Sequence, residues 1–424
     1  MSEPVWVTGM AINTPLSDGL EGTLEALLAG RSAITRWRSL DMSRCYSKIG
    51  ADLGDYPVVA RAEALYPRLP EKIALRLQKM LRRVPWSVQL GLLLAAEAVA
   101  EAGLTEEEAA LCPVVVGGHN LSSGYGEAGL SRFSADPGSV EVGQELYGLD
   151  TTQAACVSEL LGSHRPTYTV GGACASGNLA LLAGLREIRF HDAPRVLVLG
   201  ALAEPSAVSL HAFALLGALS IESFNDQPDR ASRPWDQRRE GFVPAHGGGA
   251  MILESAALAR RRGRPGHAEL CSVAVCSDAS HLTAPDEEGQ ARAITLALRR
   301  AGMAAEDVDY VSAHATSTPM GDLVELRAIR RALGAQADKI KINASKSMLG
   351  HSFSAAAIVE GIAGILQMKA GMLHGTRNID TLDPAVDLDV CSSGPCRWPV
   401  RSFLNNAFGF GGINAVSLFR SVQP

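Results

Sequence analysis

One cysteine in the chain stands where a reactive thiol would be placed. Cys174 follows a short extended run and two glycines, Gly171 and Gly172, and it begins a stretch rich in alanine and leucine. Glycines permit the tight turn between a strand and a helix, and the positive end of a helix dipole favours thiolate over thiol. The stretch therefore predicts a nucleophile at a strand–turn–helix junction. A buried structural cysteine at a helix start explains the same residues equally well.

Two histidines stand in loops that could face this thiol. His314 directly follows an apolar strand expected at 308–312, and strand ends are where α/β sheets bind their ligands. His351 precedes a helix of small residues and follows Lys346 by five positions. A third segment, 405–414, is rich in glycine, and free backbone N–H groups there could bind an oxyanion. Taken singly, each of these features also fits an ordinary structural role.

The elements that must position these residues alternate between strands and helices. Apolar strands are expected at 5–10, 113–118, 167–170, 195–202, 248–253, 268–277 and 308–312, and helices at 20–29, 71–83, 87–102, 150–161, 289–301, 321–333 and 354–370. The residues at 119–126 are expected to form a polar loop. Near-continuous apolar strands need a sheet that is covered on both faces, so the alternation predicts a layered α/β protein. A break at 256–267 divides it into two halves, 1–255 and 256–424.

The composition fits a large folded protein and excludes several classes of function. The 424 residues are 47% hydrophobic and 20% charged, and a net charge of −6 gives no reason to expect nucleic-acid binding. No apolar run reaches the roughly 20 residues that span a bilayer, and the N-terminus resembles a first strand rather than a signal peptide. Eight cysteines without a CxxC pair indicate neither a disulfide framework nor a zinc site. We expect a cytoplasmic protein without a metal or a membrane partner.

The candidate residues and their surroundings resemble one known family, the β-ketoacyl-acyl carrier protein (ACP) synthases. The similarity is greatest to the elongating, FabF-like (KAS II type) branch of the thiolase superfamily. The motifs that carry the resemblance are Cys174, His314, Lys346, His351, the Phe410 loop, and the stretches at 5–10, 27–33, 231–243 and 277–283. The resemblance covers nearly the whole chain. It implies a thiolase fold, in which two similar βαβαβαββ halves form a five-layered αβαβα sandwich.

The same resemblance implies a decarboxylative Claisen condensation in fatty acid or polyketide biosynthesis. Cys174 would accept an acyl group from an ACP, and a second ACP would bring malonyl, which loses CO₂ to give an enolate. His314 and His351 would stabilise the enolate oxygen as neutral Nε2–H donors. The backbone N–H groups of Cys174 and Phe410 would form an oxyanion hole for the acyl carbonyl. Lys346 would organise this region through hydrogen bonds.

Further residues receive binding or supporting roles from the resemblance. They are Thr316 and Thr318 for the phosphopantetheine arm, Phe213 for the acyl pocket, Phe408, Phe410 and the 278–283 loop as gates, and Glu360 in support of the catalytic groups. An ordinary core phenylalanine explains Phe213 equally well. The resemblance implies no permanently bound cofactor, an ACP that acts in trans, and a homodimer. Basic segments at 72–83 and 260–264 could meet an acidic ACP, although a solvated face is the simpler explanation.

Several positions depart from a housekeeping fatty acid synthase. His119 and Asn120 stand where elongating enzymes carry a small or apolar residue at the far end of the acyl pocket, and polar groups there disfavour a long apolar chain. Ala315 replaces the usual glycine after the first histidine. After His351, the usual Leu-Leu-Gly becomes Ser-Phe-Ser at 352–354. These departures predict a discrete ketosynthase of a polyketide pathway that accepts a short or polar acyl group.

Three alternatives stay open. A malonyl-ACP decarboxylase that supplies acetyl-ACP to a β-branching cassette would need only the histidines, so the retained Cys174 favours condensation. A non-elongating partner subunit would usually have lost this cysteine. A thiolase uses a second cysteine as base and does not decarboxylate malonyl, whereas the motifs of this chain contain two histidines.

Overall fold

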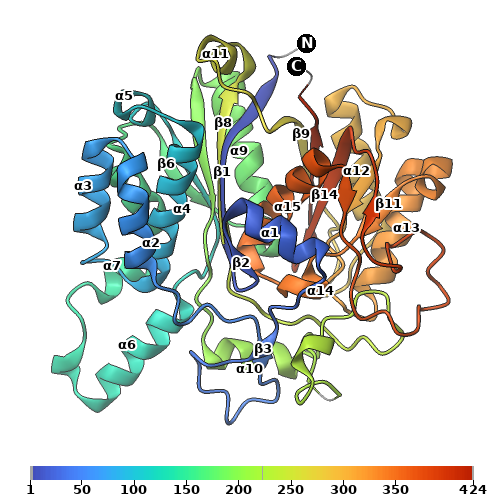
Figure 1. Ribbon diagram of the computed structural model, residues 1–424. Helices are drawn as coiled ribbons and strands as arrows, with labels where there is room; N and C mark the ends of the chain where they lie inside the picture. The colour runs from blue at the N-terminus through green and yellow to red at the C-terminus, as the bar shows by residue number, and fades with distance from the viewer. Residues whose placement is uncertain (1–2, 222, 423–424) are drawn as a thin grey trace.

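The protein is built from five layers of helices and strands, as the computed structural model of residues 3–221 and 223–422 shows (Figure 1). One sheet lies toward the left of the figure and one toward the right. Helices cover the outer face of each sheet, and two further helices lie between the sheets. The two sheets are joined along strands β1 and β9, where Trp6 pairs with Glu269 and Val7 pairs with Ala268, so that their hydrogen bonds form one continuous 11-stranded sheet.

Both sheets have the same strand order and the same strand directions. The first follows β6-β5-β7-β8-β1 and the second follows β11-β10-β14-β15-β9. In each, the first three strands are mutually parallel, and the last two run antiparallel to their neighbours. The strands are β1 (Val5–Thr14), β5 (Val114–Gly117), β6 (Thr167–Val170), β7 (Arg195–Gly200) and β8 (Gly248–Ser255) in the first sheet, and β9 (Ala268–Ser277), β10 (Tyr310–Ser312), β11 (Lys341–Asn343), β14 (Ser402–Gly409) and β15 (Ile413–Arg420) in the second.

The main helices connect these strands in the same sequence in both halves. Apart from inserted segments, the longest of which lies between β1 and α4, β1-α4-β5-α8-β6-α9-β7-β8 in the first half is repeated as β9-α12-β10-α13-β11-α15-β14-β15 in the second. The helices are α4 (Trp86–Ala102), α8 (Thr151–Leu161), α9 (Ser176–Phe190), α12 (Glu287–Ala301), α13 (Gly321–Leu333) and α15 (Ala356–Ala370). Each half is therefore the βαβαβαββ unit that the family resemblance implies.

Helices α9 and α15 form the central layer, and they touch closely. Gly177 on α9 faces α15, and a Cβ added there would lie 2.9 Å from the backbone nitrogen of Ile358, so this contact requires glycine. The stretch Phe353–Ala370, which includes α15, is long and apolar enough to cross a membrane. However, 78% of it is buried inside the protein, and the core helix of a folded protein passes the same test. The central layer thus carries the first turn of each helix to the middle of the molecule.

One predicted loop is partly helical. The segment at 119–126 contains the start of α6 (Ser123–Ala135), although Gly124 and Gly126 lower its helix propensity. Packing overrides that propensity, because Tyr125 is buried and its hydroxyl donates a hydrogen bond to Glu141 at 2.9 Å. Other predicted ends differ from the observed ones by a few residues, which is normal where helices and strands fray.

Shorter elements surround these two units. The helices are α1 (Gly19–Leu28), α2 (Val58–Leu65), α3 (Glu71–Met80), α5 (Glu106–Ala109), α7 (Gln144–Gly148), α10 (Ala207–Leu215), α11 (Ala256–Arg261) and α14 (Lys346–Leu349), and the strands are β2 (Ser17–Asp18), β3 (Thr35–Arg36), β4 (Ile49–Gly50), β12 (Met372–Leu373) and β13 (Cys396–Arg397). Two 3-10 turns matter for the site: η3 (Ala173–Ala175) precedes α9, and η7 (Phe353–Ala355) precedes α15. The boundary at residues 255 and 256 stays a prediction. It falls between β8 and α11, in a region where the two sheets are in contact.

Part of each basic segment has a structural role. Lys72 and Arg76 on α3 both pair with Glu106. Arg262, in the cluster at 260–264, pairs with Glu108 at 2.7 Å and with the buried Glu254 at 2.9 Å. These ion pairs neutralise basic side chains that could otherwise bind an acidic carrier protein.

Candidate active site

Cys174 lies in turn η3, at the junction of β6 and α9. Ala173 adopts a φ of 49°, in the left-handed region that non-glycine residues rarely occupy, which makes the turn sharp. The Ser176 hydroxyl holds the turn together, because it accepts a hydrogen bond from the Gly172 N–H at 2.9 Å and donates one to the Ala173 carbonyl at 2.7 Å. The predicted strand–turn–helix junction is present, and it presents the cysteine at the start of a central helix.

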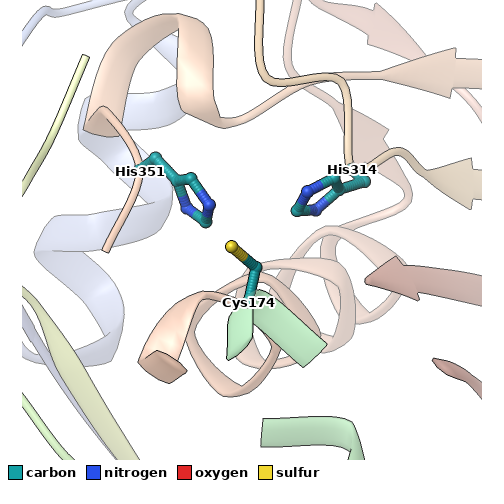
Figure 2. Close-up of side chains that lie close together, drawn as sticks. All are labelled: Cys174, His314 and His351. Atoms are coloured by element: carbon teal, nitrogen blue, oxygen red, sulfur yellow. The ribbon is translucent and has the colours of Figure 1, made fainter. Parts of the chain in front are cut away.

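Both candidate histidines converge on this cysteine, and the sulfur lies between their rings (Figure 2). The Cys174 Sγ and the nearest ring nitrogens of His314 and His351 all lie within 4.8 Å of one another. The ring centroids of the two histidines are 5.4 Å apart, and the ring planes are nearly perpendicular at 85°. His314 follows β10 and His351 follows α14, so the second half supplies both imidazoles to a thiol of the first half.

A buried carboxylate that the sequence analysis missed holds the first histidine loop. Glu325 on α13 accepts hydrogen bonds from the backbone N–H of His314 at 2.8 Å and of Ala315 at 2.7 Å. The Asn406 side chain donates to the same carboxylate at 2.9 Å. The loop needs this support because Ala315, which stands where the family carries glycine, is held at a φ of 23°. The available signal was an acid between Val324 and Leu326, on the apolar face of a predicted helix.

Lys346 and Glu360 form a buried ion pair beside the histidines. The Lys346 Nζ also lies 3.5 Å from the His314 Nδ1. An ammonium group only donates hydrogen bonds, so His314 accepts at Nδ1 and carries its proton on Nε2. The Ser345 hydroxyl donates to Glu360 at 3.3 Å. Burial raises the pKa of Glu360 to about 7, and Lys346 opposes that rise.

The environment keeps both imidazoles neutral. Burial lowers the pKa of His314 and of His351 well below the ordinary value, and the positive charge of Lys346 lowers both further. Neither ring nitrogen of His351 has a hydrogen-bond partner among the described residues. Its ring is instead packed edge-on against Phe242, with centroids 5.3 Å apart, and stacked on Phe353 at 6.0 Å. A buried histidine without polar partners is free to bind a ligand.

The surroundings of the thiol favour its protonated form, whereas the helix-dipole prediction favoured the thiolate. Burial raises the pKa of Cys174 to about 11, although Lys346 and the backbone N–H groups of Phe410 and Cys174 act to lower it. Desolvation therefore outweighs the dipole and the hydrogen bonds. The two N–H groups meet beside the sulfur because Gly409 lets the Phe410 loop approach: a Cβ added to Gly409 would lie 2.6 Å from the Gly172 carbonyl oxygen.

A cavity of about 370 Å³ lies over the three catalytic candidates. Thr316 and Thr318 line it, and their hydroxyl oxygens are 3.2 Å apart. Phe408 and Phe410 also line it, whereas Phe213 lies behind Phe410, with the two rings stacked 6.2 Å apart. The exposed side chains of Leu216, Leu282 and Met320 mark its outer end.

The structure does not bring His119 and Asn120 to this cavity. Both are exposed at the end of β5, and neither is among the residues that line the cavity. The chain turns away at Asn120, which has a φ of 49°, because the Asp150 carboxylate binds the backbone N–H groups of Asn120 and Leu121 at 2.9 Å each. In a single chain, these two residues therefore do not limit the acyl group.

Comparison with known proteins gives a consistent answer over the whole chain. Residues 2–259 match the family model "Beta-ketoacyl synthase, N-terminal domain", and residues 267–380 match "Beta-ketoacyl synthase, C-terminal domain". The polyketide biosynthesis malonyl-ACP decarboxylase PksF of Bacillus subtilis (strain 168) is 31% identical over 420 residues, which is 99% of this chain and 97% of that protein. The chloroplastic 3-oxoacyl-[acyl-carrier-protein] synthase I of Hordeum vulgare is 32% identical over 430 residues, covering 99% of this chain and 89% of that protein.

A solved structure agrees with these relatives. It contains a type II PKS acyl-carrier protein in complex with its ketosynthase bound to the hexaketide. It matches with a TM-score of 0.85 and 27% identity over 100% of both chains. The duplicated fold and its thiol between two histidines thus define an acyltransferase-type condensing enzyme of the thiolase superfamily. The chain belongs to the β-ketoacyl synthase family, of the polyketide type. This confirms the family, the thiolase fold and the enzyme class predicted from the sequence.

Proposed function

We propose that the protein is a discrete polyketide ketosynthase that condenses an acyl group carried on Cys174 with malonyl-ACP. The observation that carries this proposal is the meeting of the Cys174 sulfur with two neutral imidazoles within 4.8 Å, under a cavity that reaches the surface. A thiol supplies the site for the acyl group, and two imidazoles supply the donors for an enolate.

His351 acts as the base in the acylation step. His314 cannot accept the thiol proton, because its Nδ1 faces Lys346 and its Nε2 already carries a proton. As the sulfur of Cys174 bonds to the acyl carbonyl, His351 takes the proton and then gives it to the departing thiolate of the carrier. The N–H groups of Cys174 and Phe410 stabilise the negative carbonyl oxygen during this exchange.

Both histidines act as donors in the condensation step. The malonyl thioester loses CO₂, and its carbonyl oxygen becomes an enolate that accepts hydrogen bonds from the Nε2–H of His314 and from His351. The enolate carbon then attacks the acyl carbonyl on Cys174, the carbon–sulfur bond breaks, and the cysteine thiolate that leaves takes one proton from solvent. Imidazoles of lowered pKa suit this role because they stay neutral at physiological pH. No step needs a metal ion or a resident cofactor.

The substrates arrive on an acyl carrier protein that acts in trans. Support comes from the related ketosynthase structure with its acyl-carrier protein, and from Thr316 and Thr318, which line the cavity where a phosphopantetheine arm would pass. The carrier docks at the outer end of that cavity, around Leu282 and Met320. The enzyme works in the cytoplasm, which agrees with eight unpaired cysteines.

We infer that the active form is a homodimer. Strand β6 ends the order of the first sheet, so one of its edges is unpaired among the described residues. Large apolar side chains are exposed on the segment that begins with α6: Leu130, Phe133, Val142 and Leu146. An unpaired sheet edge and a cluster of apolar side chains favour association with a second copy. Light scattering coupled to size-exclusion chromatography measures this mass directly.

One experiment tests the reaction itself. Purified protein receives acyl-ACP and malonyl-ACP, and mass spectrometry identifies the carrier-bound products. The wild type is expected to form β-ketoacyl-ACP with an acyl adduct on Cys174, whereas Cys174→Ala is expected to release CO₂ and leave only acetyl-ACP. Cys156→Ala is the matched control, because Cys156 lies on α8, outside the cavity.

The second candidate function is malonyl-ACP decarboxylation without condensation, which the similarity to PksF favours. In that case, wild-type protein would give only acetyl-ACP even when acyl-ACP is present. The detection of an acyl adduct on Cys174 would exclude a non-elongating partner subunit.

A further inference from the structure

Four phenylalanines form a continuous aromatic wall next to the catalytic residues. Phe242 and Phe410 line the cavity, and Phe213 and Phe353 lie directly behind them. The ring of Phe213 lies 6.2 Å from Phe410, 5.8 Å from Phe242 and 6.2 Å from Phe353, measured between centroids. Phe242 and Phe353 meet edge to face at 6.2 Å. We call these four side chains the aromatic wall.

The aromatic wall stands on the side of Cys174 to which an acyl chain must turn. The carrier's arm enters between Thr316, Thr318 and Met320, so that side of the cavity is taken during the reaction. The wall begins at Phe410, whose backbone N–H lies beside the sulfur. An acyl chain bound to the sulfur therefore meets the aromatic rings within its first carbons.

Buried side chains behind Phe353 leave little room for a longer chain. Phe353, which is itself partly buried, packs against a buried cluster that consists of Trp37, Met42, Cys45 and Leu210. On its other side it packs against the cluster that contains Phe242. Protein interiors of this kind are close-packed, so a chain could pass only if an aromatic ring were displaced.

Phe353 is the member of the wall with the most constrained position. Its φ of 49° lies in the left-handed region, which is strained for a bulky residue. It stacks on His351 at 6.0 Å, which ties it to the catalytic centre. The family's usual residue at this position is leucine, so the aromatic ring is a feature of this chain.

We infer that Phe353 is a specificity-determining residue that closes the acyl end of the cavity and restricts Cys174 to acyl groups of acetyl size. The inference rests on the proposed function, since it concerns the acyl group that Cys174 accepts. It moves the size limit from His119 and Asn120, where the sequence placed it, to the second residue after His351.

The test measures acyl loading as a function of chain length. Wild-type protein, Phe353→Leu and Phe353→Ala are incubated with acetyl, butyryl, hexanoyl and octanoyl thioesters of N-acetylcysteamine, and intact mass spectrometry gives the rate of adduct formation on Cys174. The ratio of hexanoyl to acetyl loading is expected to rise by at least about tenfold in Phe353→Leu. A difference of even one methylene group in an apolar pocket changes the preference between two substrates by about that factor. Phe353→Ala should extend the gain to octanoyl.

The controls separate a pocket effect from a general disturbance. Phe224→Leu removes a buried ring that packs under Arg233, outside the cavity, and its loading ratio should equal that of wild type. Thermal unfolding checks that each variant is folded, and Phe353→Leu is the conservative choice if Phe353→Ala does not fold.

Two results would overturn the inference in different ways. Equal loading of all chain lengths by wild-type protein, or an unchanged ratio in folded Phe353→Leu, would leave the proposed function intact and remove Phe353 as the size limit. The absence of any adduct on Cys174, with every thioester and in every variant, would overturn the proposed function and this inference together.

Discussion

The two halves of the molecule open their central helices with equivalent turns that do different work. Turn η3 begins with Ala173 and turn η7 begins with Phe353, and both residues have a φ of 49°. The second residue of η3 is Cys174, and the second residue of η7 is Ser354, which is buried and whose hydroxyl has no partner among the described residues. The two turns thus carry nucleophile-type side chains at matching positions, although the family usually has glycine at position 354.

The surroundings of the two turns explain why only one of them is reactive. The N–H groups of Cys174 and Phe410 meet beside the sulfur, and both histidines face it. Turn η7 instead carries a bulky ring that packs on His351 and extends the aromatic wall. In our proposals, one copy of the turn therefore carries the acyl group, and the other limits its size. The lesson is that the reactivity of a buried side chain depends on what converges on it, and its place at a helix start is not sufficient.

Exchange of the Cys174 and Ser354 side chains is the strongest test of whether the two turns differ in reactivity because of their surroundings. The double variant Cys174→Ser, Ser354→Cys keeps one thiol and one hydroxyl but reverses their positions. We expect β-ketoacyl-ACP formation to fall by at least about a thousandfold, because loss of a catalytic nucleophile has effects of that size or larger. Mass spectrometry should find no adduct on the cysteine at 354. An acylated cysteine there would show that the two turns are interchangeable.

Removal of His351 separates the donor role from the nucleophile role. His351→Ala should lower malonyl-ACP decarboxylation by roughly a hundred- to a thousandfold, which is the usual cost of losing one donor to an oxyanion. Cys174→Ala should retain decarboxylation, so the two variants have opposite profiles. CO₂ release and acetyl-ACP formation measure both. His191→Ala is the control, because His191 follows α9 and is outside the cavity. Full decarboxylation by His351→Ala would contradict the assignment.

The Lys346–Glu360 ion pair joins the helices on either side of turn η7, because Lys346 lies on α14 and Glu360 lies on α15. Lys346→Met should lower the free energy of unfolding by about 3 kcal/mol, because it leaves a buried carboxylate without its partner. The double variant Lys346→Met, Glu360→Gln should recover much of that loss, since no buried charge remains. Condensation should stay impaired in both variants, because His314 has lost the group that fixes its tautomer. Denaturant unfolding and the product assay report the two effects separately, and recovered condensation in the double variant would refute the positioning role of Lys346.

The pH dependence of alkylation tests the state of the thiol in the first turn. Burial raises the pKa of Cys174 to about 11, so below that pH only a small fraction is thiolate, and the fraction grows as pH rises. The rate of carbamidomethylation by iodoacetamide at Cys174 should therefore increase about tenfold per pH unit between pH 7 and 10. Peptide mapping assigns the modified residue. A rate that levels off near pH 7 would mean that the helix dipole and Lys346 outweigh burial.

The sequence was informative for features that depend on residue type and on position along the chain. A cysteine after two glycines predicted the turn at η3, the alternation of strands and helices predicted a layered α/β protein, and the family resemblance implied the two βαβαβαββ halves. The sequence was uninformative for features that depend on how distant segments pack together. Glu325 binds the His314 loop only because α13 folds back against it, and the pKa of Cys174 depends on a burial that no local pattern reveals.

The acyl pocket shows the same limit. The polar character of His119 and Asn120 suggested a size limit, but Asp150 binds the backbone of this segment and turns it to the surface. Phe353 carries no chemical signal of its own, and its role emerges only from the three other rings that it touches. Predictions from residue chemistry were therefore more informative than predictions about the shape of the cavity.

Replacement of the first residue of each turn by glycine is expected to give the smallest effect. It tests whether the two turns differ only in their side chains. Both residues share a left-handed φ, which glycine adopts without strain. Ala173→Gly should raise the free energy of unfolding by up to about 1 kcal/mol, since relief of strain outweighs the loss of one methyl group. Phe353→Gly should lower it by about 3 kcal/mol, because the ring packs against two apolar clusters and its contacts contribute more than the relieved strain returns. Denaturant unfolding of the two variants measures the sign of the change in the free energy of unfolding for each. If both were destabilised, the left-handed backbone of Ala173 would be unstrained, and the two turns would differ in more than their side chains.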